Sequence, residues 1–231
     1  LAVKDLLDRE TDLESYVTIY LEEEIRAEAV VRNLGNFARF LELAASESGG
    51  IVNLRKLSQE IGVSHTTIGS YYQILEDCLI AERVEPLTQS KTRKKLTKSE
   101  KYLFFDLGVR RLAAREGTKL PRETMGQIFE QFIGLELLRS AHTKGKATKI
   151  RFWRDPDGPE VDWVIDVDGA YTPLEVKLTE NPSSSDIRHL EVFLSEYRSA
   201  KVGYLICQVP RKANLSERVI ALPWQSINEI I

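Results

Sequence analysis

Apolar and polar residues alternate in a way that predicts three consecutive strands within residues 150–178. The first strand is expected at 150–153 and is followed by Asp-Pro-Asp-Gly, a turn-forming stretch. The second is expected at 161–167 and ends at Asp168-Gly169, a dipeptide typical of two-residue hairpin turns. The third follows at 171–178. Three adjacent strands predict a sheet in the second half of the chain.

A helical period dominates the first part of the chain. Residues 11–45 are expected to be helical from the capping pattern Thr-Asp-Leu-Glu onward, with a second helix at 33–45 that Ser-Gly-Gly ends. The apolar residues expected to be buried on that second helix are Leu34, Phe37, Phe40, Leu41 and Ala44.

Residues 51–107 have the order of a helix-turn-helix followed by a wing. Two short helices are expected at 54–61 and 65–78, joined by Gly-Val-Ser, with strands at 79–86 and 101–107. This order resembles the winged-helix units of bacterial regulators. The side chains expected to face inward from the second helix and its end are Ile68, Tyr72, Leu75 and Leu79.

The first residues of such a second helix read DNA in the major groove. Here they include His65, Thr66 and Thr67, which are small and polar and bring neither Arg nor Lys. A winged helix that packs against protein is therefore an equal alternative to one that binds DNA.

A basic segment at 91–98 lies where the wing is expected, and it includes Arg93, Lys94 and Lys95. Such a cluster suits contact with DNA phosphates. A solvated loop is an equally good interpretation of a charge run.

A long helix is expected at 123–142, after a short helix and loop that end near Pro121. Glu130 lies one step off its apolar face, and Glu136 is an alternative acid on the same helix. Met125 belongs to that apolar face. The elements expected after the three strands are a helix at 186–200, strands at 202–207 and 219–223, and a helical turn at 224–227.

Composition adds limits to this picture. The 231 residues are 42% hydrophobic and 29% charged, as in ordinary globular proteins, and the net charge of −3 gives no overall attraction to nucleic acid. The two cysteines, Cys78 and Cys207, make neither a disulfide framework nor a zinc site and suggest a reducing, cytoplasmic location. No apolar run reaches the roughly 18 residues of a membrane span, and no phosphate-binding loop of the Gly-x-x-x-x-Gly-Lys-Ser/Thr type occurs.

Charged residues inside the predicted strands are the candidate chemistry. Glu175 and Lys177 alternate with an apolar residue, so they share a strand face. A hairpin about Asp168-Gly169 brings Asp162 near them. Two carboxylates and a lysine suit a hard divalent cation with an ammonium beside it. A purely structural ion pair is the alternative.

This constellation resembles the PD-(D/E)xK nuclease superfamily, in which a helix acid precedes a strand Asp and then Glu-x-Lys. The resemblance implies that Asp162 and Glu175 bind Mg²⁺ or Mn²⁺, that Glu130 supports the metal, and that Lys177 orients water or stabilises charge. The chain departs from the pattern at Pro-Glu-Val-Asp, where the superfamily has Pro-Asp.

The whole order of motifs resembles the C-terminal region of a family of prokaryotic AAA+-like ATPases. The stretches that carry it are Tyr-Leu-Glu-Glu-Glu-Ile-Arg, the winged helix, Tyr-Leu-Phe-Phe-Asp-Leu-Gly, Gly-Gln-Ile-Phe-Glu and Leu-Glu-Val-Lys. The resemblance implies that an N-terminal ATPase domain precedes this chain in the full protein, and that ATP is bound only there. It also implies an α/β fold with an all-α and winged-helix half at 1–115 and a restriction-endonuclease-like core at 116–231.

Two functions follow from these expectations. One is a metal-dependent nuclease-like module acting on DNA. The other is a non-catalytic module with a degenerate nuclease-like fold that binds DNA or a protein. The acids and Lys177 favour the first, whereas the weakly basic second helix and the net charge favour the second.

Overall fold

The computed structural model describes residues 11–13, 15–17, 33–89, 96–144, 147–156 and 158–231. Two compact units divide the chain: unit 1 is Leu1–Arg83 with Tyr102–Leu120, and unit 2 is Val84–Lys101 with Pro121–Ile231. The chain thus enters unit 2, returns to unit 1 and enters unit 2 again, whereas the sequence suggested one crossing at residue 115. Most of the helical region expected before residue 33 lies outside the described residues.

The described part of unit 1 contains four helices with polar N-caps. The helices are α3 (Leu34–Ser46), α4 (Leu54–Ile61), α5 (His65–Asp77) and α6 (Leu107–Ala113). In each helix, a backbone amide of the first turn donates a hydrogen bond to the side chain of the residue before the helix. These capping residues are Asn33, Asn53, Ser64 and Asp106 respectively. These caps satisfy backbone donors that a helix start otherwise leaves open, so each helix begins at its capping residue.

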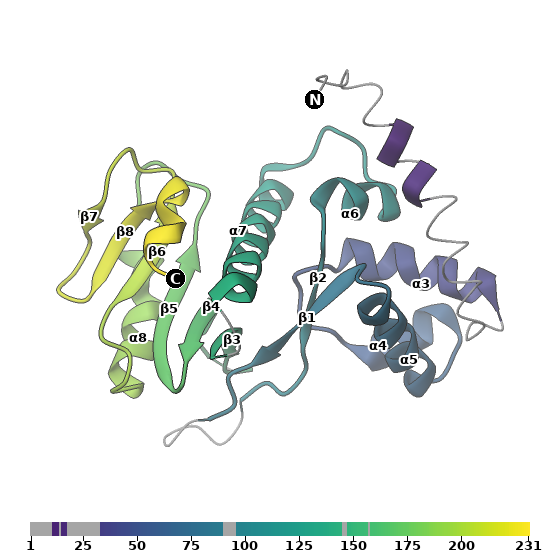
Figure 1. Cartoon of the computed structure of the whole chain (residues 1–231), viewed down its shortest axis with the longest axis horizontal. Coiled ribbons are helices and arrows are strands. Elements are labelled where there is room, and N and C mark those ends of the chain that lie inside the picture. The colour runs from purple at the N-terminus through teal and green to yellow at the C-terminus, as the bar shows by residue number, and fades with distance from the viewer. Residues whose placement is uncertain (1–10, 14, 18–32, 90–95, 145–146, 157) are drawn as a thin grey trace. The chain divides into compact units, whose positions relative to one another are not determined.

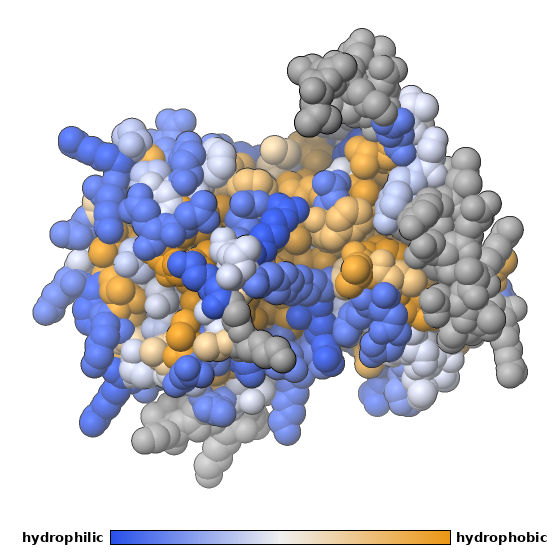
Figure 2. All heavy atoms as spheres, viewed as in Figure 1, coloured by the Kyte–Doolittle hydropathy of each residue, from blue (hydrophilic) through white to orange (hydrophobic). Residues whose placement is uncertain are grey.

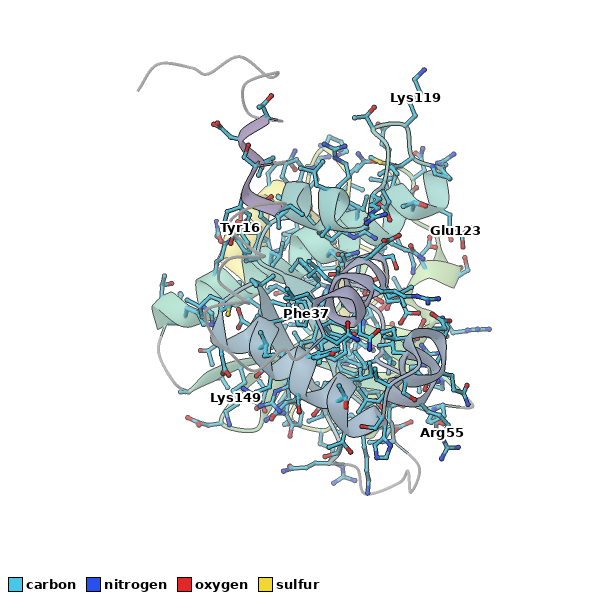
Figure 3. The ribbon with its side chains drawn as sticks, turned by 90° about the vertical axis from the view of Figure 1, so that its right-hand side faces the viewer. Tyr16, Phe37, Arg55, Lys119, Glu123 and Lys149 are labelled. Atoms are coloured by element: carbon cyan, nitrogen blue, oxygen red, sulfur yellow. The ribbon has the colours of Figure 1, made fainter. Side chains whose placement is uncertain are left out.

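Aromatic rings form the core of unit 1. The ring of Phe40 lies 5.2 Å from Tyr71 and 4.9 Å from Tyr72, measured between centroids. Tyr72 in turn stacks on Tyr102 at 4.2 Å. Figure 3 shows Phe37 among the interior side chains and Arg55 at the periphery. The predicted inward face of α3 is therefore correct for its central turns.

Two core positions predicted in unit 1 are wrong. Leu34, the first residue of α3, is 38% exposed. Leu79 is 81% exposed, because α5 ends at Asp77 and Leu79 takes a left-handed conformation with φ of 56°. The helical period that placed Leu79 inward no longer holds once the helix has ended.

Two short strands are shared between the units. β1 (Ala81–Pro86) and β2 (Lys101–Phe104) are neighbours in the sheet. β1 begins in unit 1 and ends in unit 2, whereas β2 begins with Lys101 in unit 2 and continues with Tyr102 in unit 1.

Unit 2 is a mixed sheet with helices packed on it, an α/β arrangement as expected (Figure 1). Its strands run in the order β1-β3-β4-β5-β6-β8-β7. β3, β4 and β5 correspond to the three strands predicted from alternation, but β5 ends at Val176, two residues before the predicted end at 178. β7 is a short edge strand that the sequence did not indicate. The strand bounds are β3 Thr148–Arg154, β4 Glu160–Val167, β5 Ala170–Val176, β6 Gly203–Cys207, β7 Ala213–Asn214 and β8 Val219–Pro223.

The hairpin between β4 and β5 turns at Asp168 and Gly169, as predicted. Val167 pairs with Ala170, so the loop has two residues, and both have positive φ, 50° and 84°. That geometry is the mirror-image turn whose twist matches paired strands. The amide of Gly169 also donates to Asp166 Oδ1 at 3.0 Å. The turn fixes the register of the whole hairpin.

Two helices pack on the sheet. α7 (Arg122–Lys144) contacts β3 and β5, and α8 (Arg188–Glu196) contacts β4, β5 and β6. A short 3₁₀ turn, η2 (Ser184–Ile187), precedes α8, and another, η3 (Trp224–Glu229), contacts α7.

Some boundaries on these helices differ from expectation. The predicted helix at 186–200 is shorter, because α8 ends at Glu196 and Tyr197 is extended. Met125, expected on the buried face of α7, is 44% exposed. The five inward positions predicted for the later helix are all buried, and they are Ile187, Leu190, Phe193, Leu194 and Tyr197.

The exterior is mixed in character. Hydrophilic side chains prevail on the visible surface at the left of Figure 2, where Figure 1 draws β7 and β8. Within the described part of the chain, no helix combines the length and the apolar character that crossing a membrane would require.

The turn gives a test of the hairpin. Gly169→Ala is expected to lower the free energy of unfolding by about 1–2 kcal/mol, because a side chain at positive φ is strained. Gly126→Ala is the matched control: it lies inside α7, an added Cβ meets no atom within 4 Å, and the change should stabilise by up to about 1 kcal/mol. Urea unfolding measures both. Equal effects of the two changes would contradict this account.

Candidate functional site

The hairpin brings Asp162 and Glu175 close together. Trp163 pairs with Leu174 as the last pair of the β4–β5 ladder, and Asp162 and Glu175 are the next residues on the two strands. The charge of Glu175 contributes to raising the pKa of Asp162, so the two carboxylates lie within electrostatic reach of each other. Both acids are buried, at 9% and 4% exposure. The structure thus brings the two strand acids near each other across the hairpin, as the sequence suggested.

Each of these two carboxylates has a defined partner. The amide of Val176 donates to Asp162 Oδ2 at 2.8 Å, and Lys177 Nζ donates to Glu175 Oε1 at 2.8 Å. Glu175 Oε2 is buried without a hydrogen-bond partner in the described structure. One carboxylate oxygen of the pair is therefore held inside the protein with its acceptor capacity unused.

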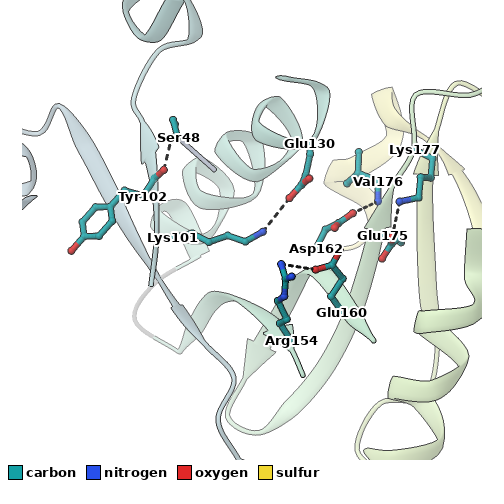
Figure 4. A network of polar contacts seen from close by, with 10 residues as sticks. All are labelled: Ser48, Lys101, Tyr102, Glu130, Arg154, Glu160, Asp162, Glu175, Val176 and Lys177. Atoms are coloured by element: carbon teal, nitrogen blue, oxygen red, sulfur yellow. Dashed lines mark hydrogen bonds and ion pairs between the residues drawn. The ribbon is translucent and has the colours of Figure 1, made fainter. Parts of the chain in front are cut away.

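Glu130 reaches the same region from α7, as Figure 4 shows. Its charge acts on both Asp162 and Glu175, since it contributes to raising the pKa of each. The rival helix acid, Glu136, instead pairs with Arg139 on its own helix, with Oε1 2.6 Å from Nη1. Of the two candidates, Glu130 is the one near the strand acids.

Lys101 is the site residue that sequence reasoning missed. Its Nζ lies 3.1 Å from Glu130 Oε1, and the whole residue is only 8% exposed. The ammonium also lies 5.1 Å from the centroid of Phe152 and 5.0 Å from that of Trp163, within the range of cation–π attraction. A lysine at the start of a predicted wing strand suggested a surface position, and no local pattern linked it to strands fifty residues away.

An exposed ion pair flanks the cluster. Arg154 Nη1 lies 3.0 Å from Glu160 Oε2, and both side chains are nearly half exposed. Figure 4 shows this pair beside Asp162. Glu160 is one of the two residues that stand between Pro159 and Asp162, where a strict motif has Pro-Asp, and the structure pairs it with Arg154.

Burial controls the electrostatics of the acids. It raises the pKa of Asp162 well above its usual range, and the neighbouring charges of Glu130 and Glu175 add to that rise. Burial also raises the pKa of Glu175 to about 7, against the opposing charge of Lys177. Burial alone would lower the pKa of Lys177, but the charges of Glu175 and Asp162 outweigh it and raise that pKa overall. Without a metal, Asp162 and Glu175 therefore bind protons more tightly than ordinary carboxylates do.

The residues can be tested for their fit to a divalent cation. Among the described residues, no group of three or more His, Cys, Asp or Glu side chains is arranged to hold a metal ion. Mg²⁺, however, is commonly held by only one or two carboxylates and keeps several waters. Asp162 and Glu175 meet that smaller requirement, and the unused Oε2 of Glu175 supplies a hard oxygen.

The predicted nucleic-acid residues fall in unit 1 or outside the described residues. His65 and Thr66 are exposed at the start of α5. Thr67 is half-buried, and its amide and hydroxyl both bond to the capping Ser64 Oγ, at 3.0 and 2.8 Å. Thr67 is therefore engaged in capping the helix. The basic residues Arg93, Lys94 and Lys95 lie outside the described residues.

Two domain families match this chain. Residues 2–120 match DUF8612 and residues 125–227 match DUF4143, both described as domains of unknown function. DUF4143 is found in AAA-ATPase-associated proteins.

Curated relatives include two uncharacterized proteins, Mb2031c of Mycobacterium bovis and Rv2008c of Mycobacterium tuberculosis. Each is 23% identical over 222 residues, which cover 93% of this chain and 47% of the relative. The chain thus spans about half the length of these relatives.

Solved structures give weaker similarity. An assembly of Thermococcus gammatolerans McrB AAA+ hexamers with bound McrC matches at a TM-score of 0.36 and 16% identity, over 82% of this chain and 46% of that one. Protein VC1899 of Vibrio cholerae matches at 0.30 and 13%, over 98% and 55%. Scores this low do not place the chain in either fold.

The raised pKa of Glu175 predicts a pH-dependent stability. Glu175 binds a proton more tightly in the folded state, with a pKa near 7, than at its ordinary value of 4.5. Unfolding between those pH values therefore releases a proton, and stability falls as pH rises through that window. In the Glu175→Gln variant, the decrease in the free energy of unfolding across this pH window should be smaller by on the order of 1–3 kcal/mol.

Urea unfolding at pH 5 and pH 8 in EDTA measures the effect. Glu180→Gln, an exposed acid shortly after β5, is the control and should keep the wild-type slope. If the Glu175→Gln variant shows the same change of unfolding free energy with pH as the wild type, the Glu175 carboxylate is ionised throughout this range and the prediction is wrong.

Proposed function

The chain belongs to the DUF8612 family, and we propose that its second unit is a divalent-metal-dependent, nuclease-like module that acts on DNA phosphodiesters. The proposal combines the Asp162, Glu175 and Lys177 constellation with the helix acid Glu130. A restriction-endonuclease-like arrangement of the core is part of the same proposal.

The observation that carries the proposal is the buried Oε2 of Glu175, which has no hydrogen-bond partner in the described structure. A buried carboxylate oxygen without a partner loses its hydration and gains nothing in return. Such an atom is rare in a purely structural ion pair, where both oxygens normally find donors. Beside Asp162, Glu175 Oε2 offers a hard ligand for Mg²⁺ or Mn²⁺.

The protein's own groups have defined tasks in this proposal. A bound divalent cation would supply charge neutralisation and an activated water. Lys177, held at 2.8 Å from Glu175, keeps that carboxylate oriented and places an ammonium beside the site. Val176 fixes Asp162 through its amide. The exposed Arg154 at the border is suited to a phosphate of the substrate.

The wider context supports association with an ATPase. DUF4143 occurs in AAA-ATPase-associated proteins, and the matched relatives are about twice as long as this chain. We propose that the module works with an N-terminal AAA+-like ATPase domain, through which alone ATP would be used.

A non-catalytic binding module is the second candidate. The specific observation in its favour is the Lys101–Glu130 ion pair, since the helix acid already has a buried cation as its partner. A cluster balanced by its own lysines can persist without metal, and unit 1 would then carry the function through DNA or protein contact.

Metal binding separates these candidates. Asp162→Asn and Glu175→Gln are expected each to weaken Mn²⁺ binding at least tenfold, because each removes one of two carboxylate ligands. Asp168→Asn, in the exposed turn of the same hairpin, should bind as wild type does. Calorimetric titration of Mn²⁺ measures all four proteins, and Mg²⁺- or Mn²⁺-dependent cleavage of single-stranded, duplex and branched DNA is assayed beside it.

The outcomes distinguish the proposals. Metal binding together with cleavage that both site variants abolish supports the nuclease-like module. Metal binding without cleavage favours the binding module. Metal binding that survives the double substitution Asp162→Asn with Glu175→Gln would refute the site.

DNA contact by the basic segment has its own test. Replacing Arg93, Lys94 and Lys95 with Gln is expected to lower the salt dependence of DNA binding, with a loss of about 0.9 in the log–log slope for each phosphate contact removed. The effect should be similar for unrelated DNA sequences, because phosphates carry no sequence information. Fluorescence titrations at several salt concentrations measure the slope, and an unchanged slope excludes this segment as the DNA-binding surface.

A further inference from the structure

Lys101 gives the acidic cluster a cation that no strand motif supplies. Its ammonium is fixed from two directions, by Glu130 Oε1 at 3.1 Å and by the rings of Phe152 and Trp163 at 5.1 and 5.0 Å. Both rings are fully buried, at 1% and 0% exposure. The ammonium therefore has little freedom to leave the cluster for solvent.

Lys101 acts on the proposed metal ligands as well as on Glu130. Its charge opposes the rise in the pKa of Asp162, which places it within electrostatic reach of that carboxylate. Counted as ionised, the three acids Glu130, Asp162 and Glu175 carry three negative charges, and Lys101 with Lys177 returns two positive ones. The cluster then has one net negative charge, and binding a divalent cation would leave it with one net positive charge.

Without Lys101, the same divalent cation would neutralise the cluster completely. The lysine also holds one oxygen of the helix acid that would otherwise be free to face the metal. We propose that Lys101 is a built-in cation that competes with the divalent metal. It occupies Glu130 and offsets part of the negative charge of Asp162, and it thereby lowers the affinity of the site for the metal. It is a positioning residue, and this inference rests on the metal site proposed above.

The direction of the expected effect separates this role from a structural one. A lysine that merely supports the fold, or one that helps to assemble the metal ligands, would leave metal binding unchanged or weaker when it is replaced. A competing cation would leave metal binding stronger. Charges a few ångströms apart in a protein interact strongly even at an effective dielectric constant of about 20, so the Kd should fall by at least about tenfold.

The substitution can be made without a large change of shape. Lys101→Met keeps an unbranched chain of similar length, and a thioether packs well against aromatic rings. Lys101→Gln is a second neutral variant, so that the test does not depend on one protein folding. Lys101→Arg keeps the charge and should stay near wild type. Lys98→Met is the matched control, because it removes one exposed lysine from the same segment.

Calorimetric titration of Mn²⁺ into the full 231-residue chain, with circular dichroism to verify folding, is the experiment. Tighter binding by at least tenfold in a folded neutral variant, with Lys98→Met and Lys101→Arg near wild type, supports the inference. Equal or weaker binding by a folded neutral variant overturns it while the proposed metal site stands. Binding by the neutral variants alone also supports it, and binding by none of the proteins overturns both proposals.

Discussion

Desolvation of carboxylates is the constraint on which unit 2 depends. Asp162 and Glu175 lie close together in the interior, where an isolated charge loses several kcal/mol of hydration. The fold offsets this with the Val176 amide, Lys177 and Lys101, each contributed by a different position in the chain. The Val176 amide is fixed by strand pairing and the Lys101 ammonium by ring contacts. The cost of burying the acids remains visible as their raised pKa values.

The hairpin was predictable because its chemistry is local. Asp168-Gly169 determines a two-residue turn, and the turn determines the register that brings Asp162 near Glu175. Glu130 was harder to predict, since the helical period left Glu136 as a rival on the same helix. The restriction-endonuclease-like core and the activity of the site stay predictions, because side-chain pattern alone does not determine what a buried acid binds.

Lys101 and Leu79 show where local pattern stops being informative. The position of Lys101 depends on the pairing of distant strands, which brings Phe152 and Trp163 to its ammonium. Leu79 depends on where α5 ends, and a helical period continues to place residues inward after the helix has stopped. The burial of Lys101 depends on tertiary contacts, and the exposure of Leu79 depends on where the helix ends. Neither can be predicted from the neighbouring residues in the sequence.

β2 ties these observations together. It has only four residues, and two consecutive ones serve different units. Lys101 pairs with Glu130 in unit 2, whereas Tyr102 stacks on Tyr72 in unit 1 and its carbonyl accepts from the Gly49 amide at 2.8 Å. Two consecutive residues of one short strand therefore meet two different demands. The same covalent neighbours therefore limit how freely β2 can vary: a residue at 101 must suit an acidic cluster, and the next must suit an aromatic core.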